Sequence, residues 1–169
     1  MINIIRKTSR FVAFFIFYTK LCLLSLSKYG YNWWMISKEE FVLLKVNMRE
    51  RYNSLLTPTY CKCLNQKITL NARGFHHLLY DGSGKARSMM QAQSRLVLVP
   101  LIPVVLRLAN DCSYEKRYVR QSRKKDSPSV LVEMWGMEAL VGKASSRIKV
   151  IVRREGGGKF IFWSIMKVR

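Results

Sequence analysis

Two strand-like runs near the C-terminus decide the fold of this chain: Ser146-Arg-Ile-Lys-Val-Ile-Val-Arg-Arg154 and Lys159-Phe-Ile-Phe-Trp-Ser-Ile-Met-Lys167. The segment Glu155-Gly-Gly-Gly158 separates them. β-branched and aromatic residues on both sides of a glycine-rich turn predict a β-hairpin. We take Arg154 as the partner of Lys159 across the turn, which sets the register of the whole hairpin.

This register assigns each residue of the hairpin to one face, because side chains alternate between the two faces of a strand. The expected core face comprises Ile148, Val150, Val152, Ile161, Trp163 and Ile165. The expected outer face comprises Arg147, Lys149, Arg153, Phe160, Phe162 and Ser164. Cations beside exposed rings suit a nucleic acid, whose phosphates are anionic and whose bases stack. An ordinary solvated sheet face is the alternative.

The composition indicates an acidic partner and no metal. The chain has 169 residues, enough for one domain with a core, and a formal net charge of +20. Such a charge favours nucleic acid or an anionic membrane surface as the partner. The four cysteines show no disulfide framework, and the Cys61-Lys-Cys63 pair lacks the second pair of a zinc site. We therefore predict no metal and no cofactor.

Residues 1–34 differ from the rest of the chain. They contain two apolar runs, interrupted by Lys20, and five of the 30 Lys and Arg but none of the 10 acids. Neither run reaches the ~20 residues that a membrane-spanning helix needs. The segment is an extension without function preceding a start at Met35, a membrane anchor or export signal, or a structured part of the fold. Without it, residues 35–169 still carry a net charge of +15 and form a single predicted domain.

From residue 35 onward the sequence predicts helices first and strands later. Ser37 and Glu40 have the spacing of a capping box at the start of a helix over 37–52. Further expected elements are a strand at 67–70, a helix at 71–80 capped by Asn71, one kinked helix or two helices at 89–110, a solvated loop or helix end at 116–125, and a strand at 130–141. This order predicts an α+β fold, with N-terminal helices packed on a small antiparallel sheet that ends in the C-terminal hairpin.

The helix at 71–80 holds a second candidate site. At 100° per residue its core side comprises Phe75, Leu78 and Leu79, and its opposite side comprises Arg73, His77 and Tyr80. We therefore expect His77 to face solvent beside a cation. Lys85 and Arg87 follow in a glycine-containing loop, where cations can hold a phosphate while an imidazole transfers a proton. A surface histidine without a role is the alternative.

The run from Lys67 to the Arg87 loop, together with the closing hairpin from Ile148 to Ser164, resembles a set of small uncharacterised bacterial proteins. Their layout is similar to the barnase/EndoU/colicin/RelE-type (BECR) ribonuclease superfamily, in which N-terminal helices, one with a histidine, precede a cationic antiparallel sheet. The resemblance covers roughly Lys67 to Lys167 and implies metal-independent RNA cleavage through the 2′-hydroxyl. It implies His77 as general acid or base, Arg153 or Lys149 as the cation on the phosphorane, and Ser164 as a phosphate ligand.

Three functions follow from these observations. The first is an RNA-cleaving enzyme of the BECR type, a class that includes toxins. The second is a nucleic-acid-binding protein without catalysis, in which RNA or another nucleic acid contacts Arg73, Lys85, Arg87, Arg147, Lys149, Phe160 and Phe162. The third is a protein of the anionic membrane surface, held there through residues 1–34. We expect a cytoplasmic location, or a membrane-associated or exported one if residues 1–34 are an anchor or signal.

Overall fold

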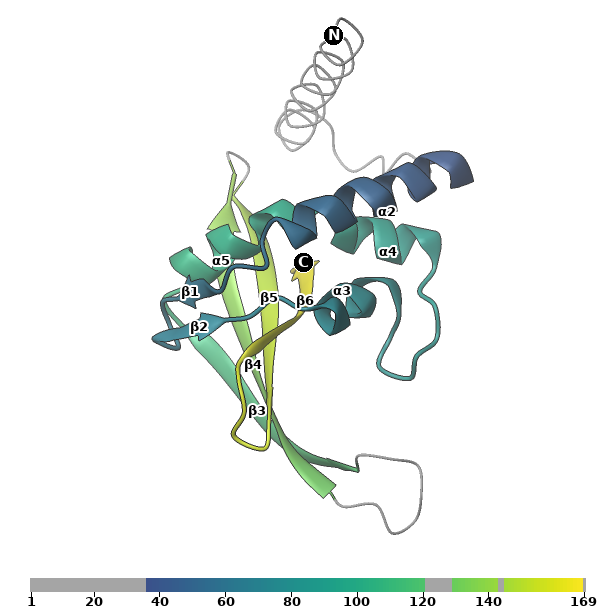
Figure 1. Cartoon of the computed structure of the whole chain (residues 1–169). Helices are drawn as coiled ribbons and strands as arrows, with labels where there is room; N and C mark the ends of the chain where they lie inside the picture. Colours follow the sequence, from purple (N-terminus) through teal and green to yellow (C-terminus); the bar gives the residue numbers. More distant parts are fainter. Residues whose placement is uncertain (1–35, 121–128, 143–144, 169) are drawn as a thin grey trace, which may run out of the picture.

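A computed structural model describes residues 36–120, 129–142 and 145–168 (Figure 1). The expectations for residues 1–34 and for a start at Met35 therefore lie outside the described residues. The described elements are α2 (Lys38–Asn53), β1 (Thr59–Cys61), β2 (Gln66–Ile68), α3 (Ala72–Leu79), α4 (Met89–Leu96), the 3-10 helix η1 (Val99–Leu101), α5 (Ile102–Leu108), β3 (Cys112–Arg120), β4 (Ser129–Val141), β5 (Ser146–Glu155) and β6 (Ile161–Lys167).

The α+β class predicted from the sequence is confirmed. The helices precede an antiparallel four-stranded sheet in the order β3-β4-β5-β6, which closes with the C-terminal hairpin of β5 and β6. β1 and β2 form a separate two-stranded sheet, so the strand predicted at 67–70 is β2, and Thr69, directly after it, makes an isolated parallel bridge to Ile161 of the main sheet. In Figure 1 the helices gather around one end of the main sheet, and β3 and β4 extend away from them.

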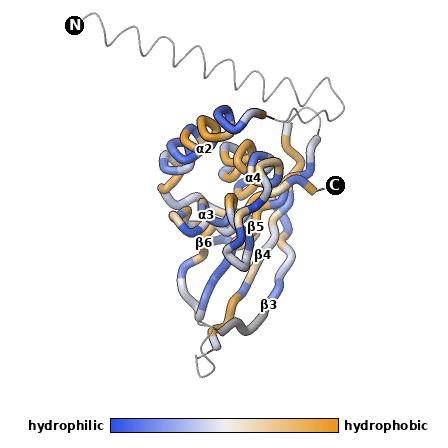
Figure 2. The backbone as a smooth tube through the Cα atoms, turned by 90° about the vertical axis from the view of Figure 1, so that its right-hand side faces the viewer, coloured by the Kyte–Doolittle hydropathy of each residue, from blue (hydrophilic) through white to orange (hydrophobic). Residues whose placement is uncertain are grey.

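The core lies between the helices and one face of the sheet. α5 packs on β4 and β5, and α3 packs on β6. Side chains without exposed surface include Leu96, Ile102 and Leu106 of the helices, and Met137, Val150 and Ile165 of the sheet. α2 adds Leu44 and Tyr52 to this core, and Figure 2 shows that polar and apolar residues are mixed along this helix. Burial of such side chains is the main favourable contribution to folding.

Local sequence signals account for the helix boundaries. The Ser37 Oγ accepts a hydrogen bond from the Glu40 N–H (3.2 Å), and the Ser37 N–H donates to Glu40 Oε2 (2.8 Å), which forms the predicted capping box of α2. The predicted cap of α3 is also present, because Asn71 Oδ1 accepts from the Gly74 N–H at 3.0 Å. The prolines at 100 and 103 lie where α4 gives way to η1 and α5, as their missing backbone donors require.

The expectation for 116–125 is wrong over its first half. Residues up to Arg120 belong to β3, in which Lys116 pairs with Glu133 and Arg117 pairs with Val132 of β4. Basic residues have no strong strand propensity of their own, so backbone pairing with the long β4 strand, rather than local sequence, holds this segment extended. Residues 121–128 lie outside the described part of the chain.

The register predicted for the hairpin is also wrong. Val152 pairs with Phe162, and Arg153 with Ile161, whereas the prediction pairs Val152 with Ile161. Further along, Ile151 pairs with Ser164, so a β-bulge at Trp163 shifts the register by one residue. The turn also differs from the predicted one, with Gly156 and Gly157 at positive φ values of 54° and 75°.

The turn changes the faces of Ile161 and Phe162, and the bulge changes the place of Trp163. Phe162 lies in the core with no exposed surface, and Ile161 shares the face of Arg153. Trp163 is buried, at 8% exposure, but it packs against charged side chains and is not part of the hydrophobic core. The assignments of Ile165 to the core and of Ser164 to the opposite face are correct. The turn shifts the pairing by one residue from the prediction and the bulge shifts it by one more, so side chains beyond the bulge return to their predicted faces.

One helical stretch in the described part of the chain, Met89–Leu108, is long and apolar enough to cross a membrane. It spans α4, η1 and α5, and 33% of its most apolar window is buried inside the protein. Length and composition alone are weak evidence, so this stretch identifies no membrane association.

Candidate functional site

The candidate site lies where α3 passes the edge strand β6. The Thr69 N–H donates to the Phe160 carbonyl, and the Phe162 N–H donates to the Thr69 carbonyl, both at 2.9 Å. These bonds tie the segment that leads into α3 to the start of β6. Gly74 permits the close approach of the helix, because a Cβ atom there would lie 2.5 Å from the Phe162 carbonyl oxygen.

His77 packs on the indole of Trp163 rather than facing open solvent. Their ring centroids are 3.8 Å apart, and the ring planes are tilted by 40°. His77 is half-buried, which corrects the expectation of a solvent-facing side chain. The helical phase correctly turns His77 away from Leu78, but the bulge in β6 brings Trp163 against its ring.

Guanidinium groups from two elements flank the same indole. The Cζ atom of Arg153, on β5, lies 4.2 Å from the Trp163 ring centroid, and that of Arg73, on α3, lies 5.6 Å from it. These are cation–π distances, which are attractive because the ring face is negative. Trp163 therefore links the histidine of α3 to the arginine of β5, two residues that lie 76 positions apart in the sequence.

Two further arginines, Arg87 and Arg95, follow His77 in the sequence and also act on it. Arg87 follows the loop after α3, and its Nε atom donates to the His77 carbonyl at 3.4 Å. Arg95, in the last turn of α4, donates to the Ser164 hydroxyl and to the Ile165 carbonyl, the latter at 3.4 Å. We call His77, Arg73, Arg87, Arg95, Arg153 and Trp163 the histidine–arginine cluster.

The surroundings of His77 keep its imidazole neutral. Burial is the largest cause, and the positive charges of Arg87, Arg153, His76 and Arg95 add to it, lowering the pKa of His77 from 6.5 to about 4. Burial also lowers the pKa of Arg95, with a contribution from Arg87. At neutral pH, His77 can therefore accept a proton but holds none to donate.

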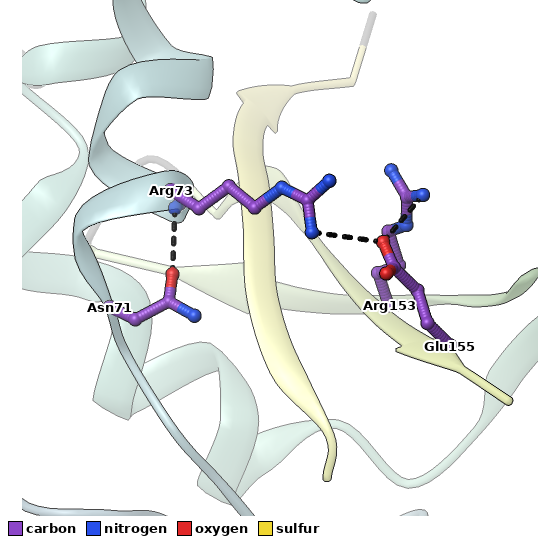
Figure 3. A network of polar contacts seen from close by, with 5 residues as sticks. Asn71, Arg73, Arg153 and Glu155 are labelled. Atoms are coloured by element: carbon purple, nitrogen blue, oxygen red, sulfur yellow. Dashed lines mark hydrogen bonds and ion pairs between the residues drawn. The ribbon is translucent and has the colours of Figure 1, made fainter. Parts of the chain in front are cut away.

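Glu155 supplies a carboxylate to this cationic site. Its Oε1 atom accepts from Arg73 Nη1 at 3.1 Å and from Arg153 Nη2 at 2.6 Å. Figure 3 shows Arg73 pointing from α3 toward Glu155, with Arg153 pointing to the same carboxylate from β5. Charge-assisted bonds of this kind are the strongest hydrogen bonds available to side chains.

The structure thus brings together some of the residues that the sequence predicts and separates others. His77, Arg73, Arg87 and Arg153 belong to one cluster. Ser164, at 4% exposure, is hydrogen-bonded to Arg95, so it positions this arginine instead of lying open to a phosphate. Lys149 pairs with Glu138 at 3.1 Å, while Arg147 and Lys85 are exposed.

Both phenylalanines predicted to stack on bases are placed differently from the expectation. Phe162 lies in the core, and its ring centroid is 5.8 Å from that of Tyr52. Phe160 is half-buried and packs on Trp135, with ring centroids 5.0 Å apart. The shifted register puts both on the helix-facing side of the sheet, so neither is offered to a ligand beside Arg153.

Three residues of the site were missed by the sequence analysis: Arg95, Glu155 and Trp163. Arg95 belongs to the cluster, and Glu155 contacts it, only through tertiary contacts. Neither residue has neighbours in the sequence that would indicate a role in the site. Trp163 carried a signal that was misread, because an indole in a strand was assigned to the core. Its position in the last strand of the chain, which forms an edge of the sheet, could have raised the alternative, since bulges are frequent at sheet edges.

Among the described residues there is no group of three or more His, Cys, Asp and Glu side chains that could hold a metal ion. Comparisons with protein-family models, with curated proteins and with solved structures found no match for this chain. A function therefore has to be inferred from the arrangement of its own residues.

Proposed function

We propose that the chain is a metal-independent RNA-cleaving enzyme, similar in layout to the BECR ribonucleases, with His77 as its proton acceptor. The observation that carries the proposal is a neutral imidazole surrounded by guanidinium groups at the junction of α3 and the sheet. Cleavage of RNA by its own 2′-hydroxyl needs these two kinds of group: one that takes the proton and cations for the charge that develops on phosphorus. Helices followed by an antiparallel sheet, the layout of that superfamily, support the proposal.

The proposed reaction is an internal displacement at phosphorus. His77 accepts the proton of the 2′-hydroxyl as O2′ bonds to phosphorus, and the bond from phosphorus to O5′ breaks. O5′ takes a proton from water, and the hydroxide that this leaves takes the proton from His77, which returns the imidazole to its neutral form. The products are a 2′,3′-cyclic phosphate and a 5′-hydroxyl. Arg87, Arg95 and Arg153 act on the additional negative charge of the phosphorane, and a half-buried site strengthens this attraction. Ser164 and the Ile165 carbonyl hold Arg95 in place.

The pH dependence tests the role of His77. A base acts only when deprotonated, and the pKa of His77 lies at about 4. We therefore expect kcat/KM for RNA, with a chelator present, to stay level from about pH 8 to about pH 5 and to fall below about pH 4, since this parameter reports the free enzyme. The acid limb of kcat should lie at higher pH, because a bound phosphate favours the imidazolium.

Rates measured across this range, with circular dichroism at each pH to verify folding, check the expectation. An acid limb of kcat/KM near 6.5, the ordinary pKa of histidine, would contradict the assigned environment of His77. Loss of activity in the chelator would contradict the metal-independent mechanism.

A nucleic-acid-binding protein without catalysis is the second candidate. It is favoured by the polar groups that neighbour the histidine–arginine cluster, because Ser164 is hydrogen-bonded to Arg95 and Glu155 pairs with Arg73 and Arg153. A binding site needs only the cations, which contact phosphates and release counterions. Both candidates have RNA as the partner and a cytoplasmic location, and neither requires the membrane surface considered for residues 1–34.

A further inference from the structure

We propose that Arg73 and Arg153 form a subsite for a phosphate monoester, which the carboxylate of Glu155 occupies until such a ligand displaces it. The identification of the ligand as the end of an RNA strand rests on the proposed function. The subsite itself rests on the geometry around Glu155.

The two guanidinium groups converge on one point from different elements. Arg73 comes from α3 and Arg153 from β5, and both donate to the same oxygen, Glu155 Oε1, at 3.1 and 2.6 Å. Two guanidinium groups aimed at one oxygen are an arrangement that also binds phosphate oxygens. The Glu155 carboxylate therefore occupies the position that a phosphate oxygen would take.

The positions of the two arginines do not depend on Glu155 alone. Both guanidinium groups also lie over the indole of Trp163. The Cζ atom of Arg153 is 4.2 Å from the ring centroid, and that of Arg73 is 5.6 Å from it. This indole is held in the bulge of β6 and is 8% exposed. The arginines therefore retain a fixed support when the carboxylate leaves, and a ligand does not have to order them again.

Glu155 can leave without disturbing the core. It is the last residue of β5, its side chain is 34% exposed, and the glycine turn follows it directly. A change of side-chain rotamer is enough to turn the carboxylate into solvent. The neighbouring ion pair of Glu133 with Arg154 differs, because the Glu133 side chain is only 10% exposed and also accepts a hydrogen bond from Tyr114.

The charges specify a phosphate monoester rather than a diester. Glu155 carries one negative charge and is tethered to the site, so it competes as if present at high concentration. A diester also carries one charge and gains no Coulomb advantage over this tethered competitor. A monoester carries a charge of about −1.5 to −2 at pH 7, which matches the two guanidinium groups.

The test is an equilibrium titration with small probes: a nucleoside 3′-monophosphate, the corresponding 5′-monophosphate, and the methyl ester of each, which is a diester. We expect the wild-type protein to bind at least one monoester about tenfold more tightly than its methyl ester. The tighter of the 3′ and 5′ monoesters identifies the end of RNA that the subsite takes. Glu155→Gln should raise the affinities for the monoesters and for the methyl esters about tenfold, because the carboxylate competes with both.

Glu138→Gln is the matched control, because Glu138 is similarly exposed (37%), pairs with Lys149, and its loss changes the net charge equally. It should leave all affinities unchanged, while Arg73→Gln should weaken monoester binding about tenfold. Equal effects of Glu155→Gln and Glu138→Gln, or no preference for monoesters in the wild type, would overturn the proposal. Because no turnover is involved, a protein that shows these affinities but cleaves no RNA contradicts the proposed function and not the subsite.

Discussion

His77→Ala is expected to lower the rate of RNA cleavage by roughly 10²–10⁴-fold, the usual contribution of one proton-transfer group. The variant removes the neutral imidazole that accepts the proton of the 2′-hydroxyl and leaves the four arginines of the cluster in place. RNA binding should persist, because the phosphate contacts come from these cations. Single-turnover cleavage and equilibrium binding, measured on the same preparation, separate the two effects.

His76→Ala is the matched control. His76 is exposed and stacks on Tyr80, with ring centroids 4.1 Å apart and the planes inclined by 8°, so it lies outside the cluster. Its replacement should leave the cleavage rate within about twofold of the wild type. A His77→Ala protein that is folded and cleaves at the wild-type rate would refute the assigned role of His77. A variant that loses binding and cleavage together would point to a structural role instead.

Phe162→Ala is expected to reduce the free energy of unfolding by about 3–5 kcal/mol, as deletion of a buried aromatic ring usually does. Phe162 has no exposed surface, lies against Tyr52, and its backbone carbonyl is the atom that α3 approaches at Gly74. The cavity would therefore open at the junction of α2, α3 and β6, where little backbone movement can close it. Urea denaturation of the wild type and the variant measures the loss.

Trp163→Ala provides the contrast, because it distinguishes the bulged register from the regular one. Trp163 packs on His77 and two arginines, so its removal should cost less stability than the loss of Phe162 while disturbing the histidine–arginine cluster. The pKa of His77, followed by nuclear magnetic resonance, should rise toward 6.5, since the indole contributes to its burial. A Trp163→Ala protein that is less stable than Phe162→Ala would contradict the bulged register and favour the regular one.

Local signals were sufficient to predict the helices, the strand β4 and the two strands of the C-terminal hairpin, and their order. Ser37 with Glu40, and Asn71 before α3, satisfy backbone donors within one helical turn, so their roles can be recognised in the sequence. The prolines at 100 and 103 act equally locally. The fold class follows from this order, since helices that precede an antiparallel sheet have to pack on one of its faces.

The face on which each hairpin residue lies could not be predicted in the same way, because it depends on how β5 pairs with β6. Alternation assigns faces correctly only while the pairing is known. The turn pairs Arg153 with Ile161 instead of Phe160, which inverts the assignment of the positions between the turn and the bulge, and the extra residue at Trp163 restores it beyond the bulge. The turn therefore explains why Phe162 was expected at the surface, and the bulge explains why the buried Trp163 lies against His77 and Arg153. The strand at 112–120 was missed for a related reason, because its partner strand rather than its own residues keeps it extended.

The candidate site was predicted in part. The helical phase of α3 identifies His77 as the histidine turned away from the core, and the basic composition of β5 points to Arg153. The contacts that give His77 its low pKa come from Arg87, Arg95 and Arg153, which only the tertiary fold brings near it. Glu155 was missed because its role depends on Arg73, which lies 82 positions earlier in the chain.

Cleavage of one RNA strand, compared with an all-2′-deoxy copy of the same sequence in the presence of a chelator, tests the central claim most directly. The mechanism at His77 requires the 2′-hydroxyl as the nucleophile and no metal ion. We predict that the RNA is cut to products with a 2′,3′-cyclic phosphate and a 5′-hydroxyl, and that the deoxy strand stays intact. Equal cleavage of the two strands, or no cleavage of any RNA, would contradict the account.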